Sequence, residues 1–232
     1  MAALKLLQLA LYLNLFSNPN RSKLWSESEN LQSFPPSCNR IECPNYDVIE
    51  IGNGYEIRRY NSPIWISTSK IQDISLVEAT RTGFMLLFDY IQGKNEYKKK
   101  IEMTAPVITQ VSPSDGPICE SSFVVSFYVP KENQADPPPA EGLHIQRWDP
   151  TYVAVRQFGG FVSDYQVGEE AAALQSSLEG SKWGAAIQKS QAANPKSSYI
   201  VAQYNSPFEF FNRVNEIWLS FDIHNVPTIS MM

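Results

Sequence analysis

Histidine and cysteine are scarce in this chain, which has two histidines and three cysteines among 232 residues. Structural zinc takes about four Cys or His ligands at short spacings, and no such spacing occurs here, so we do not expect a zinc protein. Basic residues are also outnumbered: 19 Lys and Arg against 24 Asp and Glu give a formal net charge of −5. Because this charge does not attract a polyanion, we expect no nucleic-acid partner.

The sequence also lacks the short patterns of the common enzyme classes. It contains no Gly-x-Ser-x-Gly, His-Glu-x-x-His or P-loop pattern. His144 alternates with Gln146 and Trp148 along an expected strand, which indicates a partly exposed strand histidine, and His224 lies in a polar tail. We therefore expect no catalytic residues and no metal ligands, and a protein that is not an enzyme.

The first residues carry an apolar run from Leu6 to Phe16 that follows Lys5. Such a run suits the core of a secretory signal peptide, and it falls far short of the roughly 20 residues needed to span a bilayer. We expect a cleaved signal at 1–17, no membrane span, and a secretory destination that is extracellular or vacuolar. The alternative is an amphipathic helix retained on a cytoplasmic protein.

Residues 18–45 are rich in Ser, Asn, Pro and Glu, which predicts an irregular leader to the folded domain. In an oxidising lumen, Cys38, Cys43 and Cys119 can form one disulfide and must leave one thiol. We favour a disulfide between Cys38 and Cys43, because the prolines around them indicate an irregular loop that a short-range disulfide can close. The other pairings stay open.

The folded domain is expected over 46–222, with a tail at 223–232. Ser75 can cap a helix at 75–93 that Gly93 ends, and a second helix is expected at 167–178. Runs of β-branched and aromatic residues predict strands at 46–51, 55–60, 64–69, 101–111, 121–129, 143–148, 152–158, 199–204 and 215–221. Both halves follow the order strand, strand, helix, strand, strand. This repeat predicts one α+β domain with a curved antiparallel sheet, two main helices and a pseudo-two-fold axis.

The helix at 75–93 carries more apolar side chains than one buried face can hold. The helical period places six residues on the face toward the sheet: Val77, Thr80, Phe84, Leu87, Phe88 and Ile91. Met85 then falls on the flank near Arg81, and Leu86 points nearly opposite the core. We expect an apolar segment or ligand to cover this flank.

A second apolar feature is the segment 204–213, which carries Phe208, Phe210 and Phe211 around Pro207. Exposed loops rarely hold three phenylalanines without a partner. Two interpretations stay open. The rings plug an end of the folded domain, or they form a wall of an apolar cleft.

Several of these segments together resemble the SOUL/haem-binding proteins, particularly those of plants. The resemblance runs from about Tyr46 to Phe221, and its most specific pieces are Met103-Thr104-Ala105-Pro106-Val107 and Asn215-Glu216-Ile217-Trp218-Leu219. The other pieces are the strand 55–60, the helix from Ser75, the strand 125–130, the turn Phe158-Gly159-Gly160-Phe161 and Arg213-Val214. The resemblance implies a distorted β-barrel of two similar halves with two helices.

The resemblance also implies reversible binding of haem or free porphyrin in a shallow apolar groove between the first helix and the loop before the last strand. A flat macrocycle needs broad apolar walls, and its propionates need a cation at the rim. The walls would come from Phe84, Met85, Phe88, Pro207, Phe208 and Phe211, and the cations from Arg81 and Arg213. The partner is therefore a tetrapyrrole small molecule held by a monomer.

Two positions depart from other members of the resembled family. Arg59 stands where some members have a histidine proposed as the axial ligand, and an arginine stays protonated and cannot ligate iron. Asp89 stands where some members have a basic residue, which should weaken binding of propionate. We therefore expect modest affinity and little preference for haem over a metal-free porphyrin. Iron ligation by Met85, Tyr204 or His144 has no support in the sequence.

Two functions of other classes remain as alternatives. The aromatic loop could serve an interaction module that grips a protein partner or an amphipathic ligand. A hydrolase in the same groove would instead need a polar catalytic cluster there.

Overall fold

The computed structural model describes residues 34–112, 121–193 and 199–222. The expected signal peptide at 1–17, the first part of the leader, Cys119, His224 and the tail at 223–232 lie outside these residues. No helix in the described ranges is both long and apolar enough to cross a membrane.

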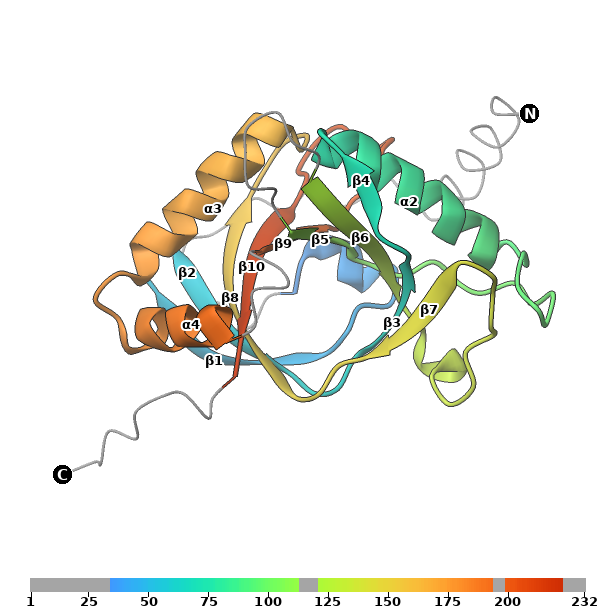
Figure 1. Cartoon of the computed structure of the whole chain (residues 1–232), viewed down its shortest axis with the longest axis horizontal. Coiled ribbons are helices and arrows are strands. Elements are labelled where there is room, and N and C mark those ends of the chain that lie inside the picture. The colour runs from blue at the N-terminus through green and yellow to red at the C-terminus, as the bar shows by residue number, and fades with distance from the viewer. Residues whose placement is uncertain (1–33, 113–120, 194–198, 223–232) are drawn as a thin grey trace.

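Ten strands form one antiparallel sheet, which curls strongly (Figure 1). The strands are β1 (Tyr46–Gly52), β2 (Tyr55–Tyr60), β3 (Ile64–Thr68), β4 (Ile71–Asp73), β5 (Val107–Ser112), β6 (Ser121–Tyr128), β7 (Leu143–Arg147), β8 (Thr151–Phe158), β9 (Tyr199–Gln203) and β10 (Asn215–Phe221). The helices are α2 (Leu76–Ile91), α3 (Asp164–Leu178) and α4 (Lys182–Ala193), with short 3₁₀ turns η1 (Pro36–Asn39) and η2 (Lys131–Asn133). The expected α+β class with a distorted antiparallel barrel is confirmed.

The strand order shows how the two halves combine. The sheet runs β1-β2-β8-β10-β9-β5-β6-β3-β7, and β4 pairs with β6 beside this path. The order from β2 to β7 maps onto itself when β2 is exchanged with β7, β3 with β8, β5 with β9 and β6 with β10. The two halves therefore meet at β9 and β5, and each half also contributes one strand that pairs with the other half: β2 pairs with β8, and β7 pairs with β3. This matches the expected repeat and its pseudo-two-fold relation.

The strands alternate between two faces of the sheet. Ile57, Ala154 and Ile217 face the core under α3 and α4, whereas Tyr60, Val155 and Trp218 face a second, aromatic core. A third core lies between α2 and the strands β3, β5 and β6. The three helices thus cover one side of the sheet, and the aromatic core fills the other.

Helix α2 begins and packs for local reasons. The Ser75 hydroxyl accepts the backbone N–H of Glu78, as expected for a cap, and Gly83 brings the helix close to β6. A methyl group at Gly83 would lie 2.4 Å from Val125 Cγ2. The buried stripe is therefore centred near Gly83, and Val77, which we expected on the core face, is 37% exposed at its edge. Leu86 is exposed, as expected.

Two sequence predictions of local structure were wrong. The strand expected at 101–111 begins only at Val107, because Pro106 has no N–H for a ladder and the Thr104 hydroxyl instead donates to the Tyr128 carbonyl at 2.6 Å. A third main helix, α4, was not predicted. Its apolar side chains Trp183, Ala186 and Ile187 pack beside β10, but its other residues are mostly polar.

The described part of the leader packs onto the domain. A disulfide joins Cys38 to Cys43, as expected, with their Cα atoms 5.5 Å apart. The Phe34 ring lies 4.5 Å from that of Tyr46, and the Glu42 carbonyl accepts the N–H of Ala105. From Phe34 onward this segment therefore packs against the sheet, because its apolar side chains join the aromatic core, and its one helical element is the short turn η1.

Candidate functional site

An open pocket of about 340 Å³ lies beside α2. One wall is the flank of the helix, and the other comes from the turn after β8 and the segment that leaves β9. Its lining is mainly apolar: Val77, Thr80, Arg81, Phe84, Met85, Val107, Phe161, Val162, Gln203, Asn205, Pro207 and Arg213. The flank of α2 that the sequence left uncovered is therefore the helix wall of this pocket.

Five of the eight residues proposed from the sequence line the pocket: Arg81, Phe84, Met85, Pro207 and Arg213. Phe88 does not. It lies one turn further along α2, where it is buried in the core with its ring 6.0 Å from that of Phe84. Phe208 and Phe211 also lie outside the lining and are exposed to solvent. The aromatic loop thus contributes Pro207 to the wall and turns its phenylalanines outward.

Other lining residues were not proposed from the sequence. Phe161 follows the turn at Gly159 and Gly160, which belongs to the family resemblance but carries no pattern that marks a binding residue. Thr80 was assigned to the core, and its hydroxyl does bond that of Thr109 on β5 at 2.8 Å. Gln203 and Asn205 flank Tyr204 at the end of β9, and no pattern in the sequence marks them.

The two arginines of the pocket have different environments. Arg81 is 74% exposed at the rim, and its Nη1 lies 3.3 Å from Glu78 Oε2. Arg213 is buried, and its Nη1 donates to the carbonyls of Ser206 and Glu209, each at 2.7 Å. Burial lowers the pKa of the Arg213 guanidinium. Arg81 is therefore the accessible cation, whereas Arg213 is bound to the loop.

Arg213 also fixes the pocket wall on its other side. Its guanidinium carbon lies 4.4 Å from the centre of the Phe161 ring, a cation–π geometry. The Asn205 side chain accepts the N–H of Val214 at 2.7 Å. These contacts tie the loop to both the turn after β8 and the start of β10, so the second wall of the pocket is preorganised.

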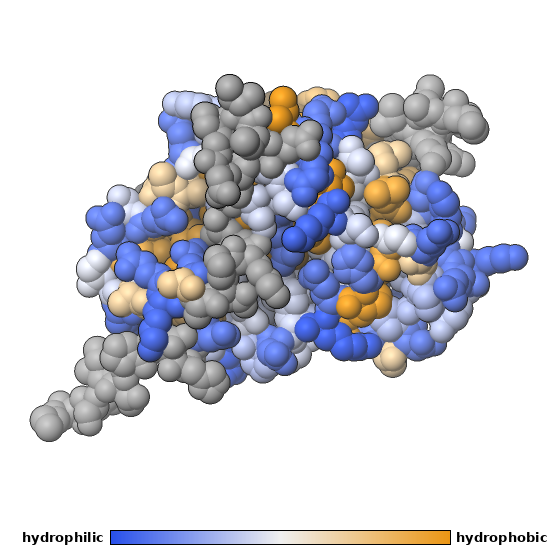
Figure 2. All heavy atoms as spheres, in the orientation of Figure 1, coloured by the Kyte–Doolittle hydropathy of each residue, from blue (hydrophilic) through white to orange (hydrophobic). Residues whose placement is uncertain are grey.

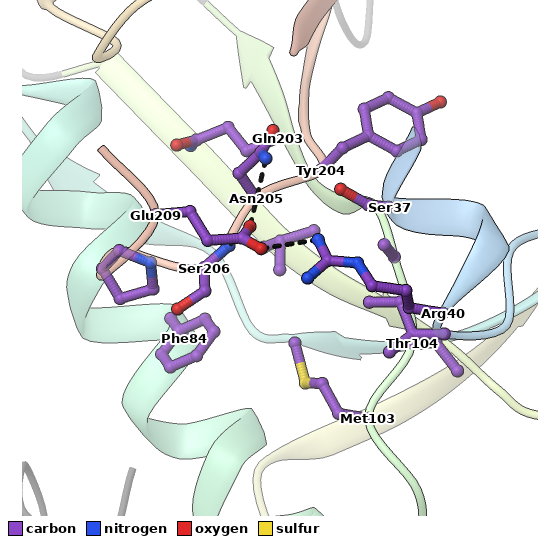
Figure 3. Close-up of a pocket in the computed structure, with 14 residues that line it drawn as sticks. Ser37, Arg40, Phe84, Met103, Thr104, Gln203, Tyr204, Asn205, Ser206 and Glu209 are labelled. Carbon is purple, nitrogen blue, oxygen red and sulfur yellow. Dashed lines mark hydrogen bonds and ion pairs between the residues drawn. The ribbon is translucent and has the colours of Figure 1, made fainter. Parts of the chain in front are cut away.

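A smaller adjoining pocket of about 70 Å³ lies between α2 and the N-terminal turn (Figure 3). Arg40 extends from this turn to Glu209, and their Nη2 and Oε1 atoms are 2.5 Å apart. The Asn205 amide and the Ser206 N–H donate to the other oxygen of Glu209. Burial opposes ionisation of Glu209, but the bond from Arg40 prevails and lowers its pKa. The disulfide-closed turn thereby holds the aromatic loop through one ion pair.

A buried polar cluster lies beneath the loop. Glu216 accepts two bonds from Arg58 at 3.0 Å, one from Tyr204 Oη at 2.9 Å and one from Trp218 Nε1 at 2.7 Å. Although burial disfavours its charge, the Arg58 pKa is raised above its usual value by neighbouring Glu216. Because Tyr204 and Glu216 stand at the two ends of the loop, this cluster closes its base.

Of the three candidate iron ligands, Met85, Tyr204 and His144, only Met85 lines the pocket. His144 is exposed on β7 and does not line the pocket, and the Tyr204 hydroxyl is bonded to Glu216. Arg59 pairs with Asp47, and Met85 remains the one thioether in the lining. No group of three or more potential metal ligands occurs in the part of the chain that the structure describes.

Apolar surface outside the pocket is dispersed where it can be seen. On the face shown in Figure 2, apolar side chains occur in small groups separated by hydrophilic ones. Among the described residues visible in that view, no continuous apolar patch occurs.

Comparison with known proteins gives consistent matches. The family model described as SOUL heme-binding protein matches residues 41–220. Human heme-binding protein 2 is 41% identical over 185 residues, which cover 77% of this chain and 85% of that protein. The mouse protein of the same name is 37% identical over the same shares, and heme-binding protein 1 of Xenopus laevis is 30% identical over 72% of this chain and 83% of its own. The matched region includes helices α2, α3 and α4 and all but the last residue of the described sheet, so the chain belongs to the SOUL heme-binding protein family.

Proposed function

We propose that this protein binds haem or a free porphyrin reversibly, as a carrier or buffer rather than as an enzyme. The observation that carries the proposal is the apolar pocket between α2 and the loop at 203–213, with the accessible guanidinium of Arg81 at its rim. A macrocycle can lie against Met85, Phe84 and Pro207, and a propionate can reach Arg81. Family membership and the names of the relatives support the same ligand class.

The residues of the pocket fit a porphyrin without strong axial ligation. Of the described residues that line it, none is a histidine, a cysteine or a carboxylate. The same lining holds no general base, and the one hydroxyl, on Thr80, is already bonded to Thr109. We therefore expect similar affinities for haem and for metal-free protoporphyrin, and no turnover of either.

The test is a titration with haemin and with protoporphyrin, followed by quenching of the five tryptophans. Both should quench saturably at micromolar ligand. Met85→Asp places a carboxylate on the pocket wall and should lower the affinity for both ligands at least about tenfold, because the macrocycle would bury a charge and because Arg81, one turn away, would pair with this carboxylate instead of a propionate. Leu86→Asp is the matched control: it puts the same charge on the next residue, outside the pocket. Absence of saturable quenching, or equal effects of the two variants, would contradict the proposal.

We also propose that the mature protein is a monomer in the secretory pathway, outside the cell or in the vacuole. The disulfide between Cys38 and Cys43 supports an oxidising compartment. A fluorescent protein fused after the full chain would report the compartment, and light scattering after gel filtration would report the mass. Accumulation of the fusion in the cytoplasm would contradict the first part, and a dimer the second.

A further inference from the structure

Four phenylalanines are exposed together at the mouth of the pocket: Phe161, Phe208, Phe210 and Phe211. We name them the aromatic rim. Phe210 is 66% and Phe211 86% exposed, and the rings of Phe161 and Phe210 lie 5.9 Å apart. Phe161 lines the pocket, and the loop that carries the other three supplies Pro207 to it. The rim therefore continues the apolar pocket wall onto the surface, where such groupings mark binding surfaces.

The two charged side chains of the loop beneath the rim both have partners within the protein. Its acid, Glu209, is paired with Arg40 and also accepts from Asn205 and Ser206. Its cation, Arg213, is buried and donates to loop carbonyls. Docking the rim on an apolar surface would therefore leave neither of these charges without a partner.

Part of the loop backbone is also hydrogen-bonded from within. The N–H of Phe208 bonds the Ser206 hydroxyl, and the N–H of Glu209 bonds the Ser206 carbonyl at 3.0 Å. These bonds lower the cost of moving this part of the loop out of water.

We propose that the aromatic rim docks on the interface of a zwitterionic lipid bilayer. The rim offers several apolar rings and no free charge, so a bilayer without net charge is its complement. The formal charge of −5 on the chain, and Glu78 beside Arg81, disfavour an anionic surface. Resting on the proposed function, the docked state would place the pocket mouth against the membrane, from which an amphipathic tetrapyrrole can enter without crossing water.

The experiment is sedimentation of the full chain with phosphatidylcholine vesicles, without porphyrin. Binding should saturate with lipid and should change little between low and high salt. The double variant F210A/F211A should lower the partition coefficient at least about tenfold, since two exposed rings no longer enter the apolar phase. The matched control I51A/Y97A removes two other exposed apolar side chains, one from β1 and one from the segment after α2. It should leave the partition coefficient unchanged.

Several outcomes would overturn the docking proposal. They are no sedimentation with phosphatidylcholine, binding only when phosphatidylglycerol is added, equal loss in both double variants, and capture of a protein partner by the rim without any vesicle binding. Porphyrin is absent from this assay, so its result is independent of the quenching titration. Vesicle binding without porphyrin quenching would support the docking surface and reject the proposed ligand. Porphyrin quenching without vesicle binding would support the ligand and reject the docking surface.

Discussion

The buried ion pair between Arg58 and Glu216 allows a quantitative test of what closes the base of the loop. Arg58 is 2% exposed and Glu216 is fully buried, and the carboxylate accepts four hydrogen bonds. We consider Glu216→Leu, Arg58→Met and the double variant. In each single variant one charge stays buried without its main partner, and in the double variant neither charge remains.

The structure sets the size of each effect. Removing one member of a buried pair costs about 3–5 kcal/mol. In Glu216→Leu, Arg58 keeps its 2.8 Å bond to Glu56 and its stacking on Tyr46, which favours the lower value, but two neutral donors lose their acceptor at about 1 kcal/mol each. We therefore expect a loss of about 4–5 kcal/mol. Arg58→Met leaves a carboxylate with only those neutral donors and should cost about 3–5 kcal/mol.

The double variant should cost about 2–4 kcal/mol, because only the hydroxyl of Tyr204 and the indole N–H of Trp218 lose their acceptor. The coupling free energy between the two sites should thus be at least about 2 kcal/mol. Urea unfolding followed by tryptophan fluorescence measures all three variants. Arg59→Met, which breaks an exposed pair with Asp47, is the control and should barely move the midpoint. A double variant whose loss of unfolding free energy equals the sum of the two single losses would refute the reasoning.

The remaining predictions concern packing and pH. Gly83→Ala should destabilise the protein by about 1–3 kcal/mol, because its methyl group would meet Val125 at 2.4 Å, whereas Gly168→Ala in α3 meets nothing within 4 Å and should be neutral or stabilising in the same urea assay. The pKa of Glu209 is lowered in the folded state, so the contribution of its charge to stability is complete above the unfolded-state pKa and is lost as pH falls through the folded-state pKa. Between about pH 5 and 3, the melting temperature of Glu209→Gln should therefore fall less than that of the parent protein. Burial raises the pKa of Tyr46 to about 12, so stability should decline as pH rises past about 10, where the unfolded phenol ionises, and Tyr46→Phe should show a smaller decline in an alkaline unfolding series.

Periodicity and capping were enough to predict most of the fold. The helix from Ser75 and the strands around the turn at Gly54 follow local rules: a side chain that caps, a glycine that accepts a positive φ, and alternating apolar residues. The repeat of elements then implied the pseudo-symmetry. The exchange of β2 and β7 between the halves was not predictable, since it depends on pairing between residues far apart in the sequence, such as Glu56 with Val155 and Thr68 with Leu143.

The pocket was predicted in part, for a similar reason. The helix period places Arg81 and Met85 on one flank whatever the helix packs against, so both were found. The direction of the loop side chains depends on contacts that no pattern shows. Arg213 holds two loop carbonyls and covers Phe161, which turns Phe208 and Phe211 away from the pocket that they were expected to line.

The place of the pocket follows from where the pseudo-symmetry fails. The N-termini of α2 and α3 meet, since the Asp164 carboxylate accepts the Leu76 N–H and the Ser75 hydroxyl. Beyond this point the helices differ. Helix α3 is followed by α4, whose Trp183 and neighbours complete the core there. The groove that remains beside these helices is lined by Glu179, Ser181 and three glutamines as well as by apolar side chains such as Leu178 and Ile187. Helix α2 has no such companion among the described residues, so its second apolar flank faces the loop before β10 across open space. A duplicated fold that covered both helices alike would have no apolar pocket to offer a flat ligand.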